Sequence, residues 1–176
     1  MSDVPELIHD SGAIKHGNFK LSGGQLTDYY VDKYAFETQP EVLDEIAADL
    51  ADRLDTSEID VIAGPELGAV PLAIATSLKT GIPSALIRKG QKHYGTQARV
   101  EGEIQKGDRV AIVEDVTTTG GTLLDTVELV EEVGGVPERL IVVVDRNQGA
   151  AENVREAGYE LEHLAQVGTD FDVDPA

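Results

Sequence analysis

The sequence has no cysteine, few basic residues and no long apolar run. The absence of cysteine excludes a disulfide framework, a thiolate zinc site and a cysteine nucleophile. No apolar stretch approaches the roughly 18–20 residues that a membrane-spanning helix needs. Residues 1–6 show neither the basic nor the apolar region of a signal peptide, and we therefore expect a cytoplasmic protein.

Acidic residues far outnumber basic ones. The 33 aspartates and glutamates against 14 lysines and arginines leave a net charge of −19. An electric field of this sign repels nucleic acids and anionic membranes. We interpret the excess acid as a surface adaptation of the kind found in halophiles, with the few basic residues reserved for a binding site. The alternative is a poorly structured acidic chain, but a hydrophobic content of 41% and strong periodicity argue against it.

Helix-like and strand-like patterns alternate along the chain after residue 40. Apolar residues recur at helical spacing in residues 41–54, 69–78, 121–133 and 150–157. Short aliphatic runs indicate buried strands at residues 59–63, 84–87, 110–113 and 140–144, with a further short strand near 163–167. Residues 89–106 show no clear period and predict a long loop or a loose hairpin.

These alternating elements predict an α/β fold. Continuous aliphatic strands between amphipathic helices are typical of a parallel sheet that is covered on both faces. A length of 176 residues suits one domain, with residues 1–40 as a small N-terminal hood and residues 41–168 as the core. Ligands of such sheets bind beyond the carboxyl ends of the strands, where the most distinctive residues of this sequence fall.

The most informative segment follows the predicted strand at residues 110–113. Two acids, Glu114 and Asp115, come first, and a turn rich in threonine and glycine leads from them into a helix. The acids suit ribose hydroxyls or a hydrated Mg²⁺ ion. Glycines let backbone amides converge on one point, threonines add hydroxyl donors, and the helix start offers unpaired N–H groups. We expect a phosphate monoester to be bound by Thr117, Thr118, Thr119, Gly120, Gly121 and Thr122.

This segment is neither a Walker loop nor a dinucleotide-binding fingerprint, because it lacks both glycine patterns. It resembles the signature of type I phosphoribosyltransferases, in which four aliphatic residues precede two acids and a Thr/Gly loop. These enzymes use phosphoribosyl pyrophosphate (PRPP). The resemblance implies that Glu114 and Asp115 contact the ribose hydroxyls of PRPP, with Asp115 in a catalytic position, and that the turn binds its 5′-phosphate.

Paired aromatic residues near the N-terminus point to the base. Their segment resembles the N-terminal signature of orotate phosphoribosyltransferases, in which an aromatic residue and a Ser/Gly turn precede a strand that ends in Asp or Asn. The resemblance implies that Tyr30 packs on the flat pyrimidine, with Tyr29 as the second candidate. Some members carry a substrate-contacting lysine where this chain has Ser22, and Lys20 or Lys33 could take its place.

Cations concentrate at the start of the long loop. Arg88, Lys89, Lys92 and His93 lie within six residues of each other in a chain that has only 14 lysines and arginines. Clustered like charges cost energy unless an anion offsets them, and pyrophosphate is such an anion. The cluster therefore predicts that these four residues bind the phosphate groups of PRPP.

The same segment resembles the family's catalytic loop, which opens Arg-Lys and has a second lysine three residues on. The resemblance implies catalytic roles for Arg88 and Lys92, and a homodimer in which loop 89–106 completes the site of the partner. Many members place a histidine two residues after the second lysine. Here His93 comes one residue after it and Tyr94 occupies the usual position, so either residue could take that role.

Two further segments complete the resemblance. Residues 64–69 are similar to the family's pyrophosphate loop, whose backbone amides bind the leaving group. Residues 145–149, which read Asp-Arg-Asn-Gln-Gly, resemble the Asp-Arg-x-x-Gly motif of orotate phosphoribosyltransferases. This implies that Arg146 binds the carboxylate of orotate, with Thr118 as a second ligand. A bidentate arginine–carboxylate pair would separate orotate from uracil, which lacks that group.

The motifs follow family order over residues 5–168. The resemblance implies transfer of ribose 5-phosphate from PRPP to orotate, which yields orotidine 5′-monophosphate and pyrophosphate in pyrimidine biosynthesis. It also implies Mg²⁺, held by oxygens of PRPP rather than directly by protein ligands. The alternatives are a purine phosphoribosyltransferase, which would lack the Asp-Arg motif, and a PRPP-sensing regulator that binds DNA or RNA. The charge of −19 and the loop cations argue against the regulator.

Overall fold

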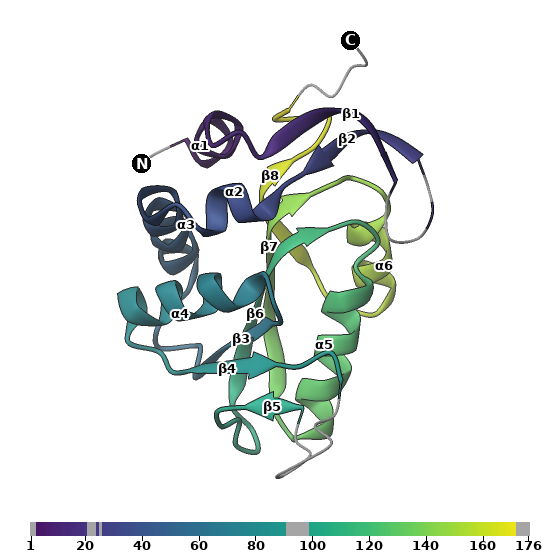
Figure 1. The fold of residues 1–176 in the computed structure, drawn as a ribbon. Coiled ribbons are helices and arrows are strands. Elements are labelled where there is room, and N and C mark those ends of the chain that lie inside the picture. Colours follow the sequence, from purple (N-terminus) through teal and green to yellow (C-terminus); the bar gives the residue numbers. More distant parts are fainter. Residues whose placement is uncertain (1–2, 21–23, 25, 91–98, 172–176) are drawn as a thin grey trace.

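A six-stranded sheet forms the core of the computed structural model, which describes residues 3–20, 24, 26–90 and 99–171. Its strands are β3 (Val61–Pro65), β4 (Ser84–Ile87), β5 (Val100–Glu101), β6 (Arg109–Thr117), β7 (Val136–Asp145) and β8 (Leu161–Gln166). The order across the sheet is β5-β4-β3-β6-β7-β8 (Figure 1). All neighbours pair in parallel except β4 and β5, so the carboxyl ends of five strands meet at one edge.

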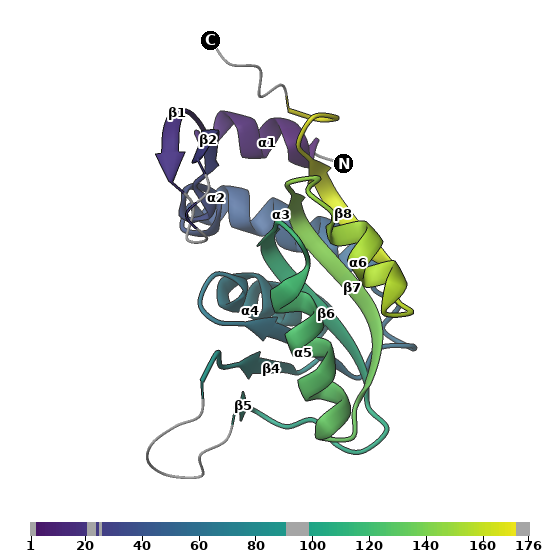
Figure 2. The same cartoon turned by 90° about the vertical axis from the view of Figure 1, so that its right-hand side faces the viewer.

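Helices cover both faces of the sheet (Figures 1 and 2). One face carries α3 (Pro40–Arg53) and α4 (Ala69–Thr80), and the other carries α5 (Gly121–Glu132) and α6 (Ala150–Glu156). Side chains of β6 alternate between two apolar clusters: Ala111 and Val113 pack with α3 and α4, whereas Val110 and Ile112 pack with α5. The α/β architecture expected from the sequence is confirmed. No helix in the described part of the chain is long and apolar enough to cross a membrane.

The N-terminal residues form a small hood beside the carboxyl ends of the strands (Figure 1). It contains α1 (Val4–Asp10), an antiparallel ribbon of β1 (Ile14–Lys20) and β2 (Leu26–Val31), and the short helix α2 (Lys33–Glu37). Ile8 and Phe36 are fully buried and share an apolar cluster with Leu50 of α3 and Leu72 of α4. Because this cluster is continuous with the core, α2 is held firmly against the sheet.

Several boundaries differ from the sequence-based expectation: β6, for example, runs on to Thr117 and so includes Glu114 and Asp115. Strand β7 begins at Val136 rather than residue 140, and its first residues alternate between exposed and half-buried positions. The first four residues of β7 lie beyond the part of the sheet that helices cover on both faces. They therefore need no aliphatic run, and the sequence pattern does not indicate a strand there. Residues 100–101 pair with β4 as an antiparallel edge strand, which supports the hairpin alternative for residues 89–106. Residues 91–98 lie outside the described residues.

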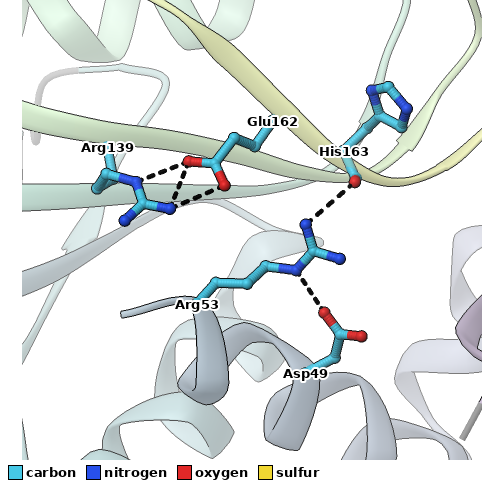
Figure 3. A network of polar contacts seen from close by, with 5 residues as sticks. All are labelled: Asp49, Arg53, Arg139, Glu162 and His163. Atoms are coloured by element: carbon cyan, nitrogen blue, oxygen red, sulfur yellow. Dashed lines mark hydrogen bonds and ion pairs between the residues drawn. The ribbon is translucent and has the colours of Figure 1, made fainter. Parts of the chain in front are cut away.

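A polar network ties the edge strand β8 to its neighbours (Figure 3). The guanidinium of Arg139 on β7 donates from Nε and Nη2 to the two carboxylate oxygens of Glu162 on β8, at 2.6 and 2.8 Å. Arg53 of α3 pairs with Asp49 and donates from Nη1 to the backbone carbonyl of His163 at 3.5 Å. These contacts are about one-third exposed, so they contribute modestly to stability. In the sheet register, Arg139 lies beside Ala111 of β6, three residues before Glu114.

Candidate active site

Two buried acids occupy the carboxyl end of the central strand β6. Glu114 and Asp115 are 4% and 5% exposed, respectively. Adjacent strand residues point to opposite faces of a sheet, so Asp115 faces α2 and Glu114 faces α5. On the α2 side, Lys33 Nζ lies 2.6 Å from Asp115 Oδ2. On the α5 side, Thr122 lines the same cavity as Glu114, whose Oε2 is buried and has no partner among the described residues.

Burial and neighbouring charge reduce the ionisation of Glu114. Burial, together with the charge of Asp115, raises the pKa of Glu114 to about 8. For Lys33, burial acts to lower the pKa, but the hydrogen bond and charge of Asp115 outweigh it, so the pKa is raised. Lys33 therefore stays protonated and neutralises Asp115. The strand end is accordingly far less negative than its two acidic residues suggest.

Helix α2 contributes a second buried acid beside Asp115. Glu37 is 2% exposed, and neither of its carboxyl oxygens has a hydrogen-bond partner in the described part of the chain. Burial, followed by the charge of Asp115, raises the pKa of Glu37 to about 8. Sequence reasoning did not identify Glu37. The available signal was its spacing of four residues from Lys33, which places both side chains on one face of a helix.

The Thr/Gly turn between β6 and α5 is held by its own hydrogen bonds. Thr117 is buried, and its Oγ1 accepts a hydrogen bond from the Gly120 N–H at 3.1 Å. Gly120 has φ +82°, a left-handed conformation that favours glycine, and an added Cβ would lie 3.3 Å from a methyl group of Val154. From α6, Asn153 Nδ2 donates to the carbonyl of Thr119 at 2.9 Å. The turn thus presents the N-terminus of α5, whose first N–H groups have no intrahelical acceptor.

The turn at residues 64–69 approaches the acids so closely that only glycine fits. A Cβ built on Gly68 would lie 1.6 Å from Asp115 Oδ2 and 2.8 Å from Lys33 Nζ. In the same turn, Glu66 Oε1 accepts a hydrogen bond from the backbone N–H of Lys89 at 2.8 Å, which connects it to the start of the long loop. A cavity of about 120 Å³ lies between these segments. It is lined by Lys33, Pro65, Glu66, Lys89, Glu114, Asp115, Val116 and Thr122.

A larger cavity of about 260 Å³ adjoins the first and shares Pro65, Lys89 and Thr122 with it. Arg88 and Arg99 also line it. Their backbones pair, with the Arg88 N–H donating to the Arg99 carbonyl at 2.8 Å. Arg88, Lys89 and Arg99 therefore lie on the side of the site next to the long loop, and the phosphate-binding roles of Arg88 and Lys89 stay predictions. The predicted roles of Lys92, His93 and Tyr94 fall outside the described residues.

Arg146 forms a second part of the site, beyond the end of β7. It is 6% exposed, and its backbone N–H donates to the carbonyl of Thr117 at 3.0 Å. Its Nε donates to the hydroxyl of Tyr29 at 3.1 Å, and its guanidinium carbon lies 4.6 Å from the centre of the Tyr29 ring. Gln148 Nε2 donates to the same hydroxyl at 3.5 Å. Nη2 is buried without a hydrogen-bond partner among the described residues.

The two neighbouring tyrosines of β2 lie on opposite faces of the ribbon. Tyr29 is buried against Arg146, whereas Tyr30 is 38% exposed and its ring centre lies 5.6 Å from that of Phe19. The residue chosen from the sequence for the pyrimidine, Tyr30, is therefore not the one that contacts Arg146, and its role stays a prediction. Of the two candidate lysines, Lys33 lines the central cavity, while Lys20 is exposed at the end of β1.

Comparisons with known proteins agree along almost the whole chain. A family model described as phosphoribosyl transferase domain matches residues 34–162. The chain is 48% identical over 169 residues to an orotate phosphoribosyltransferase of Methanothermobacter thermautotrophicus, covering 96% of this chain and 92% of that protein.

Solved structures show the same similarity. The orotate phosphoribosyltransferase of Aeropyrum pernix superposes with a TM-score of 0.81 at 28% identity, covering 95% of each chain. The Mycobacterium tuberculosis orotate phosphoribosyltransferase in complex with PRPP superposes with a TM-score of 0.73 at 30% identity. That match covers 94% of this chain and 96% of the other.

Proposed function

The chain belongs to the orotate phosphoribosyltransferase family, enzymes that transfer ribose 5-phosphate from PRPP to orotate, and we propose that the transfer takes place at the carboxyl end of β6. The observation that carries this proposal is the close packing of Gly68 against Asp115 and Lys33, two residues that line one cavity. In our proposal, Asp115 and Glu114 accept hydrogen bonds from the ribose hydroxyls. The 5′-phosphate then lies in the turn of residues 117–122, at the N-terminus of α5.

The pyrophosphate of PRPP is proposed to lie between the turn of residues 64–69 and the start of the long loop. Arg88 and Lys89 line the cavities there, and Arg99 adds a third cation. Arginine and lysine stabilise the negative charge that grows on pyrophosphate as it leaves. Lys92 and His93 complete this set in the proposal, on the strength of the sequence pattern.

Orotate is proposed to bind beside Arg146. The free Nη2 of Arg146 suits one oxygen of the orotate carboxylate, because a charge-assisted hydrogen bond would satisfy a buried donor. Thr118 follows Thr117, whose carbonyl accepts the Arg146 N–H, so it is a second candidate ligand. Tyr29 holds the guanidinium through its hydroxyl and its ring. Tyr30 remains the residue proposed to pack on the pyrimidine ring.

Mg²⁺ is proposed to arrive with PRPP and to be held by substrate oxygens. No group of three or more potential metal-ligating side chains occurs in the described ranges 3–20, 24, 26–90 and 99–171. Asp115 is paired with Lys33, and the pKa of Glu114 is raised, so neither acid presents a free carboxylate. These residues fit a metal that the substrate coordinates. When bound, Mg²⁺ neutralises charge on the pyrophosphate.

The protein then acts mainly through position and charge. In this reaction class the bond from the anomeric carbon to pyrophosphate breaks with oxocarbenium-like character, and a nitrogen of the base forms the new bond. Holding PRPP and the base in contact converts an encounter into a unimolecular step. Closure of the long loop would exclude water, which would otherwise hydrolyse PRPP.

A cytoplasmic homodimer completes the proposal. Ile74 and Leu78 lie on one face of α4 and are 41% and 82% exposed, an apolar surface that suits a second copy. A cytoplasmic location is supported by the charge of PRPP, which cannot cross a lipid bilayer unaided. Light scattering of the purified protein would measure its mass. A monomer at assay concentration would contradict the proposal that loop 89–106 completes the site of a partner subunit.

The direct test mixes purified protein with PRPP, Mg²⁺ and orotate at low and at molar KCl, and follows the loss of orotate absorbance. Uracil, adenine and hypoxanthine serve as parallel substrates. Turnover of orotate alone, dependent on Mg²⁺, is the expected result, and higher activity in molar KCl would support the halophilic interpretation of the acidic surface. Turnover of a purine would favour the purine alternative, and PRPP binding without turnover would favour the regulator.

A further inference from the structure

Glu37 is a buried acid that the roles assigned above do not use. It ends α2, directly after Phe36, whose fully buried ring anchors the helix in the core. Neither carboxyl oxygen of Glu37 finds a donor among the described residues. A buried, ionised carboxylate without a donor is costly, because it loses its hydration and gains nothing in return. Either protonation of Glu37 or a neighbouring polar group must therefore offset this cost.

The neighbour is the carboxylate of Asp115. Lys33 lies four residues before Glu37 on the same face of α2, and its Nζ is 2.6 Å from Asp115 Oδ2, so Asp115 and Glu37 share one buried corner of the site. Two ionised carboxylates only accept hydrogen bonds. The carboxyl groups of Glu37 and Asp115 can therefore bond to each other only when one of them carries a proton. The other charged groups that face Glu37 are Lys33, which pairs with Asp115, and Asp32, which pairs with Lys15. Asp115 already pairs with the ammonium of Lys33, whereas Glu37 has no partner among the described residues, so the proton belongs on Glu37.

We propose that Glu37 is a positioning residue of this active site: as a neutral carboxylic acid it donates a hydrogen bond to Asp115 and, together with Lys33, fixes the carboxylate that receives the ribose. This proposal rests on the proposed function of Asp115. The raised pKa of Glu37, about 8, agrees with the geometry. The arrangement explains how a chain of net charge −19 can bind the polyanion PRPP, since the cluster of Lys33, Asp115 and neutral Glu37 has no net charge.

The test compares two substitutions of Glu37. Glu37→Gln keeps the shape and supplies an amide donor that cannot ionise, so it should retain kcat/KM for PRPP within about threefold. Glu37→Met removes the donor at similar volume, and kcat/KM for PRPP should fall about tenfold or more, the size of one lost charge-assisted hydrogen bond. The KM for orotate should not change in either variant, because the base site is elsewhere.

Stability separates this role from a merely structural one. Replacing a buried acid by an apolar residue of similar size should leave the Tm of Glu37→Met unchanged or raised. Thr76→Val is the matched control, because Thr76 is also fully buried with a hydroxyl that has no partner in the described part of the chain. It lies on α4 outside the site, and its kcat/KM for PRPP should equal that of the wild type.

Two outcomes would overturn the proposal. Wild-type kcat/KM for PRPP in Glu37→Met would show that Asp115 needs no donor from Glu37. A fall of about tenfold or more in kcat/KM for PRPP in Glu37→Gln would show that Glu37 acts as a charged carboxylate. The second outcome can be read even if Glu37→Met does not fold. An inactive wild type would instead contradict the function proposed for the site, and calorimetry with PRPP alone would then compare the variants.

Discussion

The ribose-phosphate part and the base part of the site are built in different ways. Glu114, Asp115 and the phosphate turn follow one another within residues 114–122, at the junction of one strand and one helix. Tyr29 and Arg146 are 117 residues apart in the chain, yet their side chains bond at 3.1 Å. A local segment can specify the first arrangement, whereas the second exists only once the hood has packed on the sheet.

Their electrostatics differ as well. The ribose-phosphate part contains three buried acids. Lys33 neutralises Asp115, and burial raises the pKa of Glu37 and Glu114, so their negative charge is reduced. The base part has one buried cation, Arg146, which lies against an aromatic ring and keeps one donor free. The comparison suggests that the first part must avoid repelling a polyanion, while the second must select one carboxylate. Substitutions in the ribose-phosphate part should therefore change the kinetic constants for PRPP, and substitutions in the base part should change those for orotate.

The largest effect is expected from Asp115→Asn. The change removes the charge that accepts the ribose hydroxyl and leaves the half-buried ammonium of Lys33 without its partner. We expect kcat/KM for PRPP to fall about 100-fold, a typical loss for one electrostatic contact in an active site. Steady-state kinetics with PRPP varied measures it, and thermal melting controls for folding. A loss smaller than tenfold in a folded variant would contradict the central role of Asp115.

Arg146→Ala should affect the other substrate. Removing the guanidinium deletes the charge-assisted hydrogen bond proposed for the orotate carboxylate, so the KM for orotate should rise about 30-fold. The KM for PRPP should change by no more than about threefold. Arg146→Lys should not restore orotate use, because an ammonium cannot bond Tyr29 and a carboxylate with the same planar geometry. Equal losses for both substrates would mean that the two parts are not separable.

Stability should depend on pH through the ribose-phosphate part. The folded-state pKa of Glu37 is about 8 against an ordinary value of 4.5, so between these values the folded chain holds a proton that the unfolded chain has released. The free energy of unfolding should therefore fall as pH rises from 4.5 to 8, on the order of 1 kcal/mol for each unit of pKa difference. Urea titrations of Glu37→Gln should show a shallower slope, with Glu114 retaining part of it. An unchanged slope would contradict a neutral Glu37.

The smallest effect is expected from Tyr29→Phe. The ring still packs against the guanidinium, but the hydroxyl that accepts from Arg146 Nε is lost. One hydrogen bond of this kind is worth about 1 kcal/mol, so the KM for orotate should rise about three- to fivefold. Tyr159→Phe is the matched control, since its hydroxyl bonds Glu131 outside the site. A Tyr29→Phe enzyme with wild-type orotate kinetics would show that Tyr29 does not orient Arg146.

The sequence by itself determined the elements and the contiguous motif. Aliphatic runs identified the buried strands because a parallel sheet covered on both faces needs apolar residues throughout. The same reasoning missed the first part of β7 and left residues 89–106 open, because these segments lie at exposed edges where no apolar pattern is required. Glu114, Asp115 and the threonine turn were identified together because they follow one another in one short segment at the end of a strand.

The tertiary structure alone decided which distant residues meet that motif. Lys20 and Lys33 were equivalent in the sequence, and the packing of α2 on the core placed Lys33 beside Asp115. Tyr29 and Tyr30 were adjacent candidates, and the alternation of β2 turned Tyr29 toward Arg146. Composition and spacing do not encode such contacts, because they depend on how the hood docks against the sheet, which is set by burial of many apolar residues at once.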